Sequence, residues 1–446
     1  MFERPDAGER AIIVHVTFKQ HASGPNIEEF YELVSSAGAE TVTTVSATRD
    51  KPHPRLFIGT GKADELKAIA ERRHADVVLV NHELSPAQER NLEKHLACRV
   101  IDRTRLILDI FAQRARSFEG KLQVELAQLK HLSTRLVRGW THLERQKGGI
   151  GLRGPGETQL ESDRRMIGQR IKQINERLRR VRSQRQQSAR SRKRALLSTV
   201  SIVGYTNAGK STLFNRLTGS EIYAADQLFA TLDTTLRRFD VSGEHPALLS
   251  DTVGFIRDLP PELIAAFQAT LEETADAALL LHVIDCNAPE ASENVVEVHR
   301  VLERIGVRDT PMIEVFNKID LQDAIEPHVE RNAAGQVSRV WVSANTGAGM
   351  HLLLESIAEC LNESKVRKRL LLPPHAGRLR AKLYSFGAVI DETALDSGGW
   401  ALEVTLASAR WETLLDRIAS EMREFNIADP QDRANEITSR ADSVAV

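Results

Sequence analysis

The stretch Gly204-Tyr-Thr-Asn-Ala-Gly-Lys-Ser211 decides the fold predicted for the centre of this chain. It follows the apolar run Thr199–Val203, which suits a buried strand, and leads into Thr212-Leu-Phe-Asn215, which suits the start of a helix. Glycines allow successive backbone N–H groups to point inward, and the helix N-terminus adds its dipole. The GxxxxGK[ST] spacing in this strand–loop–helix context predicts a phosphate-binding loop in a mostly parallel α/β domain. A glycine turn with a purely structural role is the alternative that these eight residues alone leave open.

The loop supplies the first candidate ligands for a nucleotide. Lys210 is expected to neutralise the β- and γ-phosphates, and Ser211 is expected to place its hydroxyl on Mg²⁺. The other candidates are groups of the loop and of the residue after it: Gly204, Tyr205, Thr206, Asn207, Ala208, Gly209 and Thr212.

Three further motifs follow the loop in order, each directly after an apolar run. Asp251-Thr-Val-Gly254 offers a carboxylate for the outer shell of Mg²⁺ and a backbone N–H for the γ-phosphate. In Asn317-Lys-Ile-Asp320, the last carboxylate can accept hydrogen bonds from N1–H and the 2-amino group of guanine, which adenine cannot supply in that arrangement. Ser343-Ala344 suits the loop whose backbone N–H recognises guanine O6. The order and spacing predict GTP and GDP binding and GTP hydrolysis, with these further candidate ligands: Asp251, Thr252, Val253, Gly254, Asn317, Lys318, Asp320, Ser343, Ala344 and Asn345.

The residue that usually orients the attacking water is missing. Many GTPases carry a glutamine directly after the glycine of DxxG, but here that position is Phe255, whose ring can neither donate nor accept the required hydrogen bond. Either another group positions the water, or catalysis is incomplete until a partner binds. Asn207 resembles the asparagine of potassium-using GTPases, where this side chain helps to hold a monovalent cation, so K⁺ is a candidate second cofactor. A helix-capping or loop-bracing amide is the alternative.

A strongly basic segment precedes this domain. Residues 114–194 hold 22 Lys and Arg against 7 Asp and Glu, a net charge of +15, whereas the whole chain has a net charge of −1. Leucines from Leu122 to Leu136 and apolar residues from Leu160 to Val181 recur at heptad-like spacings, which predicts an antiparallel helical hairpin. The glycine-rich residues 148–156 form its loop. Such a charge favours a polyanionic partner, and RNA phosphates fit it.

The remaining segments suggest four parts: a small α/β domain over 1–112, the basic hairpin over 113–195, the GTPase domain over 196–364, and a small α/β domain over 375–446. The residues between the last two domains, up to about Pro374, are interpreted as a basic linker. In the last domain, the pattern predicts strands at Arg380–Ile390 and Trp400–Ala407 and a helix at Trp411–Arg423.

Composition places the chain among soluble globular proteins. Of its 446 residues, 41% are hydrophobic and 27% are charged. The first residues are charged where a signal peptide needs an apolar core, and no apolar stretch is long enough to span a bilayer, so neither export nor stable membrane insertion is expected. Three scattered cysteines fit a reducing compartment. We therefore expect a cytoplasmic monomer; peripheral membrane association and dimeric or domain-swapped states are alternatives.

The motifs together resemble the HflX family of translational GTPases, close to the Obg group. The resemblance is carried by the phosphate loop, by Phe229-Ala-Thr-Leu-Asp233, by Asp251-Thr-Val-Gly-Phe-Ile-Arg257, and by the hairpin loop Gly148-Gly-Ile-Gly-Leu-Arg-Gly-Pro-Gly-Glu-Thr-Gln-Leu-Glu161. It covers nearly the whole chain, including the order of its parts. One departure is Thr234, where the family pattern predicts proline; its loss puts the rigidity of switch I in doubt.

The resemblance implies roles for residues that spacing alone does not assign. It selects Thr231 as the switch I ligand of Mg²⁺ and adds Phe229, Ala230 and Leu232 to the nucleotide site. It also implies that the chain binds the large ribosomal subunit, and that some members split stalled or idle ribosomes, notably under heat stress. Within the hairpin loop, the residues expected to contact ribosomal RNA are Gly149, Gly151, Arg153 and Gly154. The alternatives are a ribosome-assembly or RNA-modification GTPase and a signalling or scaffold GTPase whose coiled coil binds protein.

Overall fold

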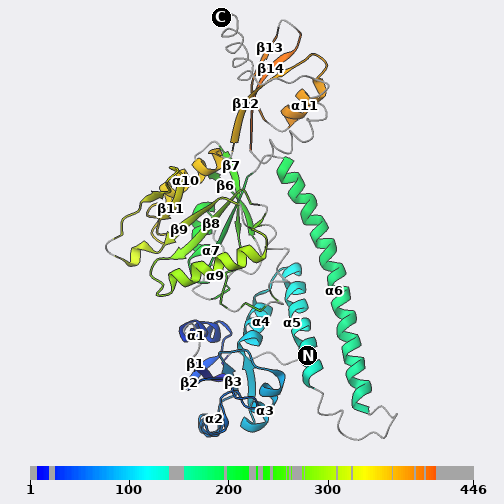
Figure 1. Ribbon diagram of the computed structural model, residues 1–446, viewed down its shortest axis with the longest axis vertical. Helices are drawn as coiled ribbons and strands as arrows, with labels where there is room; N and C mark the ends of the chain where they lie inside the picture. Colours follow the sequence, from blue (N-terminus) through cyan, green and yellow to red (C-terminus); the bar gives the residue numbers. More distant parts are fainter. Residues whose placement is uncertain are drawn as a thin grey trace, which may run out of the picture.

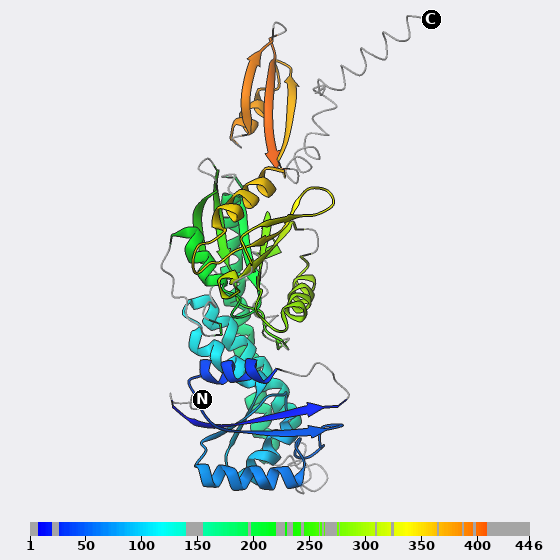
Figure 2. The same ribbon diagram turned by 90° about the vertical axis from the view of Figure 1, so that its left-hand side faces the viewer.

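The chain forms an elongated molecule, with the N-terminal sheet at one end, the central sheet in the middle and a small sheet at the other end (Figures 1 and 2). The computed structural model describes residues 8–19, 26–139, 155–194, 198–219, 228–229, 235–241, 245–257, 259–260, 263, 274–275, 277–307, 310–322, 325–363, 365–385, 388–395 and 398–407.

The N-terminal sheet has four parallel strands in the order β2 (Glu40–Arg49), β1 (Arg10–Phe18), β3 (Val77–Val80) and β4 (Arg99–Asp102). Successive residues of β1 enter two different apolar clusters: Ile13 lies in one, and Ile12 and Val14 lie in the other. This alternation is typical of a parallel sheet covered on both faces. The covering helices are α1 (Ile27–Ser36), α2 (Thr60–Arg73), α3 (Pro86–Leu96) and α4 (Arg103–Arg114).

Two long helices, α5 (Phe118–Gly139) and α6 (Pro155–Arg194), pack against each other along part of the predicted seam. The cluster between them consists of Leu122, Leu126, Ile174 and Leu178, flanked by Leu129 and Ile171. A bidentate ion pair between Glu125 and Arg170 reinforces it, with contacts of 2.6 and 3.0 Å. At about 1.5 Å per residue, the 40 residues of α6 reach roughly 60 Å. No helix of the described part of the chain has the length and apolar character needed to span a lipid bilayer.

The central sheet has seven strands, and β5 (Thr199–Gly204) lies in its interior. Strands β11, β9, β8, β5 and β7 run parallel, while the edge strands β10 and β6 pair antiparallel with their neighbours. The sheet is therefore mostly parallel, as predicted. The bounds of the other strands are β6 (Thr235–Val241), β7 (His245–Asp251), β8 (Leu279–Asp285), β9 (Met312–Asn317), β10 (Val329–Arg331) and β11 (Val337–Trp341). The helices are α7 (Lys210–Thr218), α9 (Ala291–Arg304) and α10 (Met350–Glu363), and η1 (Ile319–Leu321) is a short 3₁₀ turn.

The C-terminal sheet corrects two expectations. The segment interpreted as a basic linker is strand β12 (Lys365–Leu372), because Leu370 and Leu372 alternate into an apolar cluster while it pairs antiparallel with β14 (Trp400–Ala407). The strand predicted from Arg380 is instead the end of α11 (Gly377–Ser385).

Helix α11 forms there because Ala376, Leu379 and Leu383 recur at helical spacing and bury one face. The third strand, β13 (Val389–Ala394), begins only after this helix, and the strand predicted at the end of the segment, β14, is confirmed. The helix predicted at Trp411–Arg423 lies outside the described residues.

Candidate nucleotide site

The phosphate loop connects β5 to α7 at the end of the central sheet, in the predicted strand–loop–helix arrangement. Two glycines are required there by contact as well as by conformation. A Cβ on Gly204 (φ +152°) would lie 2.3 Å from the carbonyl oxygen of Val283, and one on Gly209 (φ +90°) would lie 2.2 Å from Asn317 Nδ2. A larger residue at either position would displace a neighbouring strand end, so the loop can follow this path only with glycine.

Lys210 begins α7 and points back across the loop. Its Nζ donates a hydrogen bond of 2.5 Å to the carbonyl of Tyr205. Burial lowers its pKa to about 8, although the Asp251 carboxylate opposes this shift. A buried ammonium with one carbonyl contact is a good partner for phosphate oxygens.

Ser211 and Asp251 form the donor set expected for a magnesium ion. The Ser211 hydroxyl donates to Asp251 Oδ2 at 3.2 Å, and the carboxylate is only 1% exposed at the end of β7. The parallel pairing of β5 with β7, which places Ile202 opposite Asp251, brings these two groups to the same sheet edge. Hydroxyl and carboxylate oxygens are the ligands that Mg²⁺ prefers, so these residues fit the ion that P-loop GTPases generally use.

The segment after Asp251 is held directly on the phosphate loop. Thr206 N donates to the carbonyl of Phe255 at 2.8 Å, and Phe255 N donates to the carbonyl of Gly204 at 3.1 Å. Between them, a Cβ on Gly254 would meet Thr206 Cγ2 at 2.9 Å and Lys210 Nζ at 3.0 Å, so the close approach needs glycine. The Phe255 ring is 2% exposed and lies in the apolar cluster, which removes it from any position where it would face the attacking water.

Asn317 ties the base-binding motifs to the phosphate loop. Its buried amide donates from Nδ2 to the carbonyl of Ala208 at 2.9 Å and accepts from Ala344 N at 2.9 Å. Ser343 Oγ donates to Asp320 Oδ1 at 2.6 Å, which orients that exposed carboxylate. The predicted guanine-binding residues are therefore brought together by the ends of β9 and β11.

Contacts with neighbouring residues also hold Lys318 and Asn345 at these strand ends. Lys318 has a left-handed backbone (φ +68°), and its Nζ lies 2.8 Å from Asp285 Oδ2. The Asn345 carbonyl accepts from Arg216 Nη2 at 2.7 Å, and Arg216, a residue of α7, had not been predicted. Because Arg216 lies outside every motif, no sequence signal assigned it.

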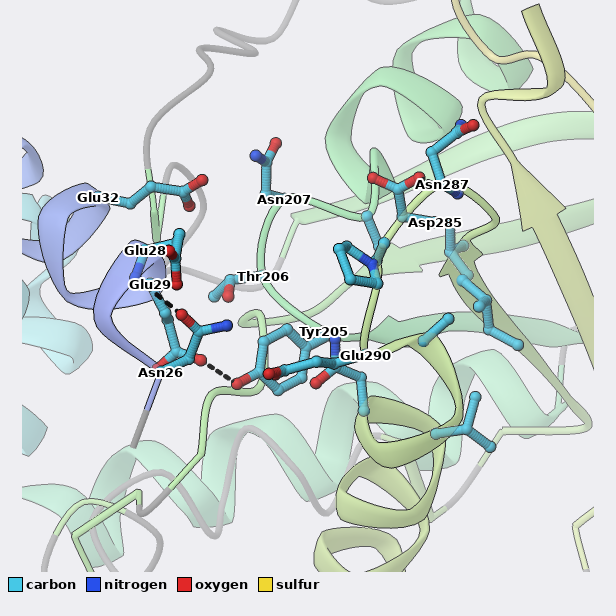
Figure 3. A pocket seen from close by; sticks show the side chains of 18 of the residues that line it. Asn26, Glu28, Glu29, Glu32, Tyr205, Thr206, Asn207, Asp285, Asn287 and Glu290 are labelled. Carbon is cyan, nitrogen blue, oxygen red and sulfur yellow. Dashed lines mark hydrogen bonds between the residues drawn. The ribbon is translucent and has the colours of Figure 1, made fainter. Parts of the chain in front are cut away.

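Helix α1 of the N-terminal part faces the phosphate loop across a cleft of about 300 Å³ (Figure 3). Glu28, Glu29 and Glu32 line one side, and the exposed Asn207 of the phosphate loop lies on the other. Among the described residues, none forms a hydrogen bond with the Asn207 side chain. This observation argues against the loop-bracing role that the sequence left open.

A polar network connects the two parts at one end of this cleft. The Tyr205 hydroxyl donates to Glu29 and accepts from Arg257 N at 2.9 Å. Burial raises the pKa of Tyr205 strongly, with the Glu29 carboxylate adding to the effect, so the phenol stays protonated as the donor. Arg103 forms an ion pair with Glu29 and donates to the carbonyl of Arg257 at 3.3 Å. Sequence reasoning had found no function in the N-terminal part, since single charged residues of a helix carry no signal for a partner so distant.

Several predicted site residues are placed differently or lie outside the described residues. The Phe229 ring packs 4.4 Å from that of Phe111, so its side chain belongs to the core and only its backbone remains for the nucleotide. Thr252 is buried and donates to the carbonyl of Ile202 at 2.6 Å. The predicted residues outside the described part of the chain are Ala230, Thr231, Leu232, Gly149, Gly151, Arg153 and Gly154.

The strand-end motifs on a mostly parallel sheet define a P-loop GTPase. Comparison with known proteins agrees: residues 25–112 match the family described as GTP-binding GTPase N-terminal, residues 114–192 match GTP-binding GTPase Middle Region, and residues 199–318 match 50S ribosome-binding GTPase. GTPase HflX of Escherichia coli (strain K12) is 55% identical over 414 residues, which cover 93% of this chain and 97% of that protein. GTPase HflX of Magnetococcus marinus is 44% identical over 395 residues, or 88% of this chain and 91% of that one.

The chain therefore belongs to the HflX family of GTPases. Among solved structures, the complex of SsGBP with GDP is similar at 25% identity, with a TM-score of 0.45 and coverage of 78% of this chain and 98% of that one.

Proposed function

We propose that this GTPase binds the large ribosomal subunit through its basic helical hairpin, that the bound subunit completes its catalytic site, and that it thereby splits or rescues stalled or idle ribosomes, notably under stress. The observation that carries the proposal is the exposed positive charge of α6, in a chain whose nucleotide site has Phe255 where many GTPases have the glutamine that orients water. The following basic side chains of α6 are exposed: Arg164, Arg165, Lys172, Arg177, Arg179 and Arg180. The matched family description, 50S ribosome-binding GTPase, supports the same partner.

In this proposal each nucleotide-site residue has one task. Lys210 binds the β- and γ-phosphates, and the backbone N–H groups of the loop surround them. Ser211, Asp251 and Thr231 hold Mg²⁺, which neutralises charge on the phosphates. Asp320 binds the guanine edge, and the Ala344 backbone binds its O6. Ordering of switch I around Thr231 and of switch II from Asp251 then distinguishes the GTP-bound form, and hydrolysis permits release from the subunit.

We further propose that Asn207 is a ligand for K⁺. Its amide oxygen has no partner among the described residues, and the Glu28 and Glu32 carboxylates that line the cleft make the surroundings favourable for a cation. GTP turnover should then be roughly tenfold or more faster in potassium than in sodium buffer of equal ionic strength, because a fixed cation stabilises charge on the phosphates. The measurement is phosphate release in the two buffers.

The matched control for this cation test is Asn207→Ala, which should turn over equally slowly in both buffers. Equal rates for the unaltered protein in sodium and potassium would exclude the potassium role.

The hairpin loop supplies the second test. The triple variant Arg145→Ala, Lys147→Ala and Arg153→Ala should weaken binding to large subunits, because three fewer phosphate contacts release fewer counterions. The slope of log K against log salt should fall by about 2 to 3. Co-sedimentation with purified large subunits over a salt series measures both quantities, and GTP turnover without ribosomes should not change.

A charge-matched control for the hairpin variant is Arg72→Ala, Arg73→Ala and Lys94→Ala, three exposed positions on α2 and α3. These changes remove the same charge from the N-terminal part. If the hairpin variant and this control bind large subunits alike, the loop is not the contact.

The proposed ribosomal role also suggests where the protein acts and in which oligomeric state. We propose that the protein acts in the cytoplasm, where it would meet ribosomes, that it is a monomer, and that any membrane association is peripheral.

A further inference from the structure

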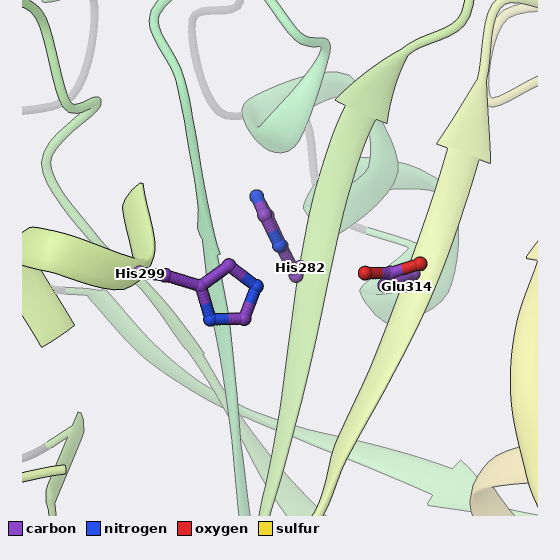
Figure 4. Close-up of side chains that lie close together, drawn as sticks. All are labelled: His282, His299 and Glu314. Atoms are coloured by element: carbon purple, nitrogen blue, oxygen red, sulfur yellow. The ribbon is translucent and has the colours of Figure 1, made fainter. Parts of the chain in front are cut away.

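Three side chains with metal-binding atoms lie together on one face of the central sheet, and none of them is among the groups assigned above to GTP and Mg²⁺ (Figure 4). His282 also lines the cleft beside the phosphate loop. His282 comes from β8, Glu314 from β9 and His299 from α9. His282 and Glu314 are direct partners in the parallel register of β8 and β9, so their side chains lie on the same face. One ligand atom from each of the three residues lies within 4.8 Å of the other two.

The burial and the hydrogen bonding of the His282 imidazole are unusual. Its side chain is 1% exposed, and its Nδ1 is buried without a hydrogen-bond partner among the described residues. Buried polar nitrogens are rarely left in this condition unless water, an ion or another ligand satisfies them. The His299 ring lies edge-on to it, with centroids 5.5 Å apart and planes at 79°, so neither ring covers the other.

Glu314 is oriented as a ligating carboxylate usually is. Arg339 Nε donates to its Oε2 at 2.8 Å, and the guanidinium lies 5.8 Å from the Phe316 ring centre. Hydrogen bonds of this kind from a neighbouring donor hold metal-binding carboxylates in position. The ion pair with Arg339 therefore engages one oxygen of Glu314, and the other oxygen is the one that can bind an ion.

We propose that His282, His299 and Glu314 bind a divalent transition metal ion, with Zn²⁺ as the best fit. Two imidazole nitrogens and one carboxylate oxygen are a ligand set that Zn²⁺ accepts, with water in the fourth tetrahedral position. With bonds of about 2.0–2.1 Å, the ligand atoms must come to about 3.4 Å from one another. Rotation of His299 and Glu314, both only partly buried, supplies this movement. Mg²⁺ prefers oxygen ligands, so this site is chemically distinct from the Ser211–Asp251 pair.

The bound ion would link α9 to the sheet. Glu293, in the first turn of α9, forms an ion pair of 2.5 Å with Arg257, which directly follows the Gly254–Ile256 segment of switch II. Fixing α9 on β8 and β9 therefore also restrains the partner of Arg257. A ligand that binds only the folded chain raises its thermal stability, so Zn²⁺ should increase Tm.

The test uses the full-length, untagged chain, first treated with a chelator and then saturated with GDP and Mg²⁺ so that the phosphate-loop site is occupied. Co²⁺ is titrated while visible absorption is recorded, and Zn²⁺ is titrated by calorimetry and by thermal unfolding. We expect one Co²⁺ per chain with the visible bands of a four-coordinate site, displacement of Co²⁺ by Zn²⁺, and a higher Tm with Zn²⁺.

His299→Ala and Glu314→Gln are the informative variants, because both leave the buried His282 in place. Each should weaken Zn²⁺ binding at least tenfold and abolish the rise in Tm, while GDP affinity shows that the variant is folded. His351→Ala, which removes an exposed histidine from α10, is the control and should bind Zn²⁺ like the unaltered chain. Absence of saturable one-to-one binding, or equal affinity in the unaltered chain and both informative variants, would overturn the proposal.

Discussion

Replacement of Asp320 by asparagine is expected to change the preferred base from guanine to xanthine. In the proposed site, the carboxylate accepts from guanine N1–H and the 2-amino group, whereas an asparagine amide would face that amino group with its own N–H donors. Sites built around such hydrogen bonds reject a base that leaves them unpaired by roughly 10³–10⁵-fold, and we expect GTP affinity to fall by this amount. Xanthine carries a carbonyl in place of the amino group, so XTP should bind the variant and be hydrolysed.

The hydrogen bond between Ser343 and residue 320 can be kept when asparagine replaces Asp320. Ser343 Oγ donates to Asp320 Oδ1 at 2.6 Å, and an asparagine keeps an acceptor oxygen for this bond while presenting Nδ2 to the base. Competition binding with labelled GDP and XDP measures the exchange. The paired control is Asp285→Asn, which alters the partner of Lys318 without altering the proposed contact to the base. Unchanged preference for guanine in Asp320→Asn would show that the base is recognised elsewhere.

Replacement of Lys210 by alanine should abolish most GTP hydrolysis. Its ammonium is buried at the start of the helix that follows the phosphate loop, and removal of one such transition-state contact costs about 10²–10³-fold in rate, with a further loss in affinity. Lys51→Ala removes an exposed lysine and is the control. Single-turnover hydrolysis at saturating enzyme separates the chemical step from binding. A rate within a fewfold of the unaltered protein would exclude Lys210 from the phosphate site.

The lowered pKa of Lys210 predicts that nucleotide affinity depends on pH. Burial lowers its pKa to about 8, so in the protein without nucleotide the charged form is lost as the pH rises through that value. Phosphate binding favours the charged form, and GDP affinity should therefore fall between pH 7 and pH 9. In Lys210→Ala this decline should be absent. An equal decline in the variant would assign the titration to another group.

Much of the nucleotide site could be predicted from the sequence, because each motif is a short continuous segment. The residues that act together within a motif are therefore close in the sequence as well as in space. Asp251 and Asn317 are the last residues of β7 and β9, Ser343 lies just after β11, and parallel strands bring their ends to one edge. Phe255 also led to the prediction that the catalytic site is incomplete without a partner, because a phenyl ring cannot orient water. The structure adds that this ring is buried in the apolar cluster.

The contacts between the N-terminal part and the GTPase part could not be predicted in this way. Tyr205 and Glu29 are 176 residues apart, and nothing in either local sequence identifies the other as its partner. The same holds for Phe111 with Phe229, whose family motif had suggested a nucleotide contact rather than a core position. In the C-terminal part, Arg380–Ser385 was assigned to a strand because short apolar patterns suit either element. Packing against the neighbouring sheet decides between them.

We propose that the catalytic site of this GTPase is incomplete and that the large ribosomal subunit completes it. The most direct test is GTP turnover by the full-length protein alone, with purified small subunits and with purified large subunits, in potassium buffer. Partner-supplied groups accelerate other P-loop GTPases by about 10³–10⁵-fold, and we predict at least about 100-fold stimulation by large subunits and little by small ones. Fast turnover by the protein alone that large subunits do not increase would contradict the account.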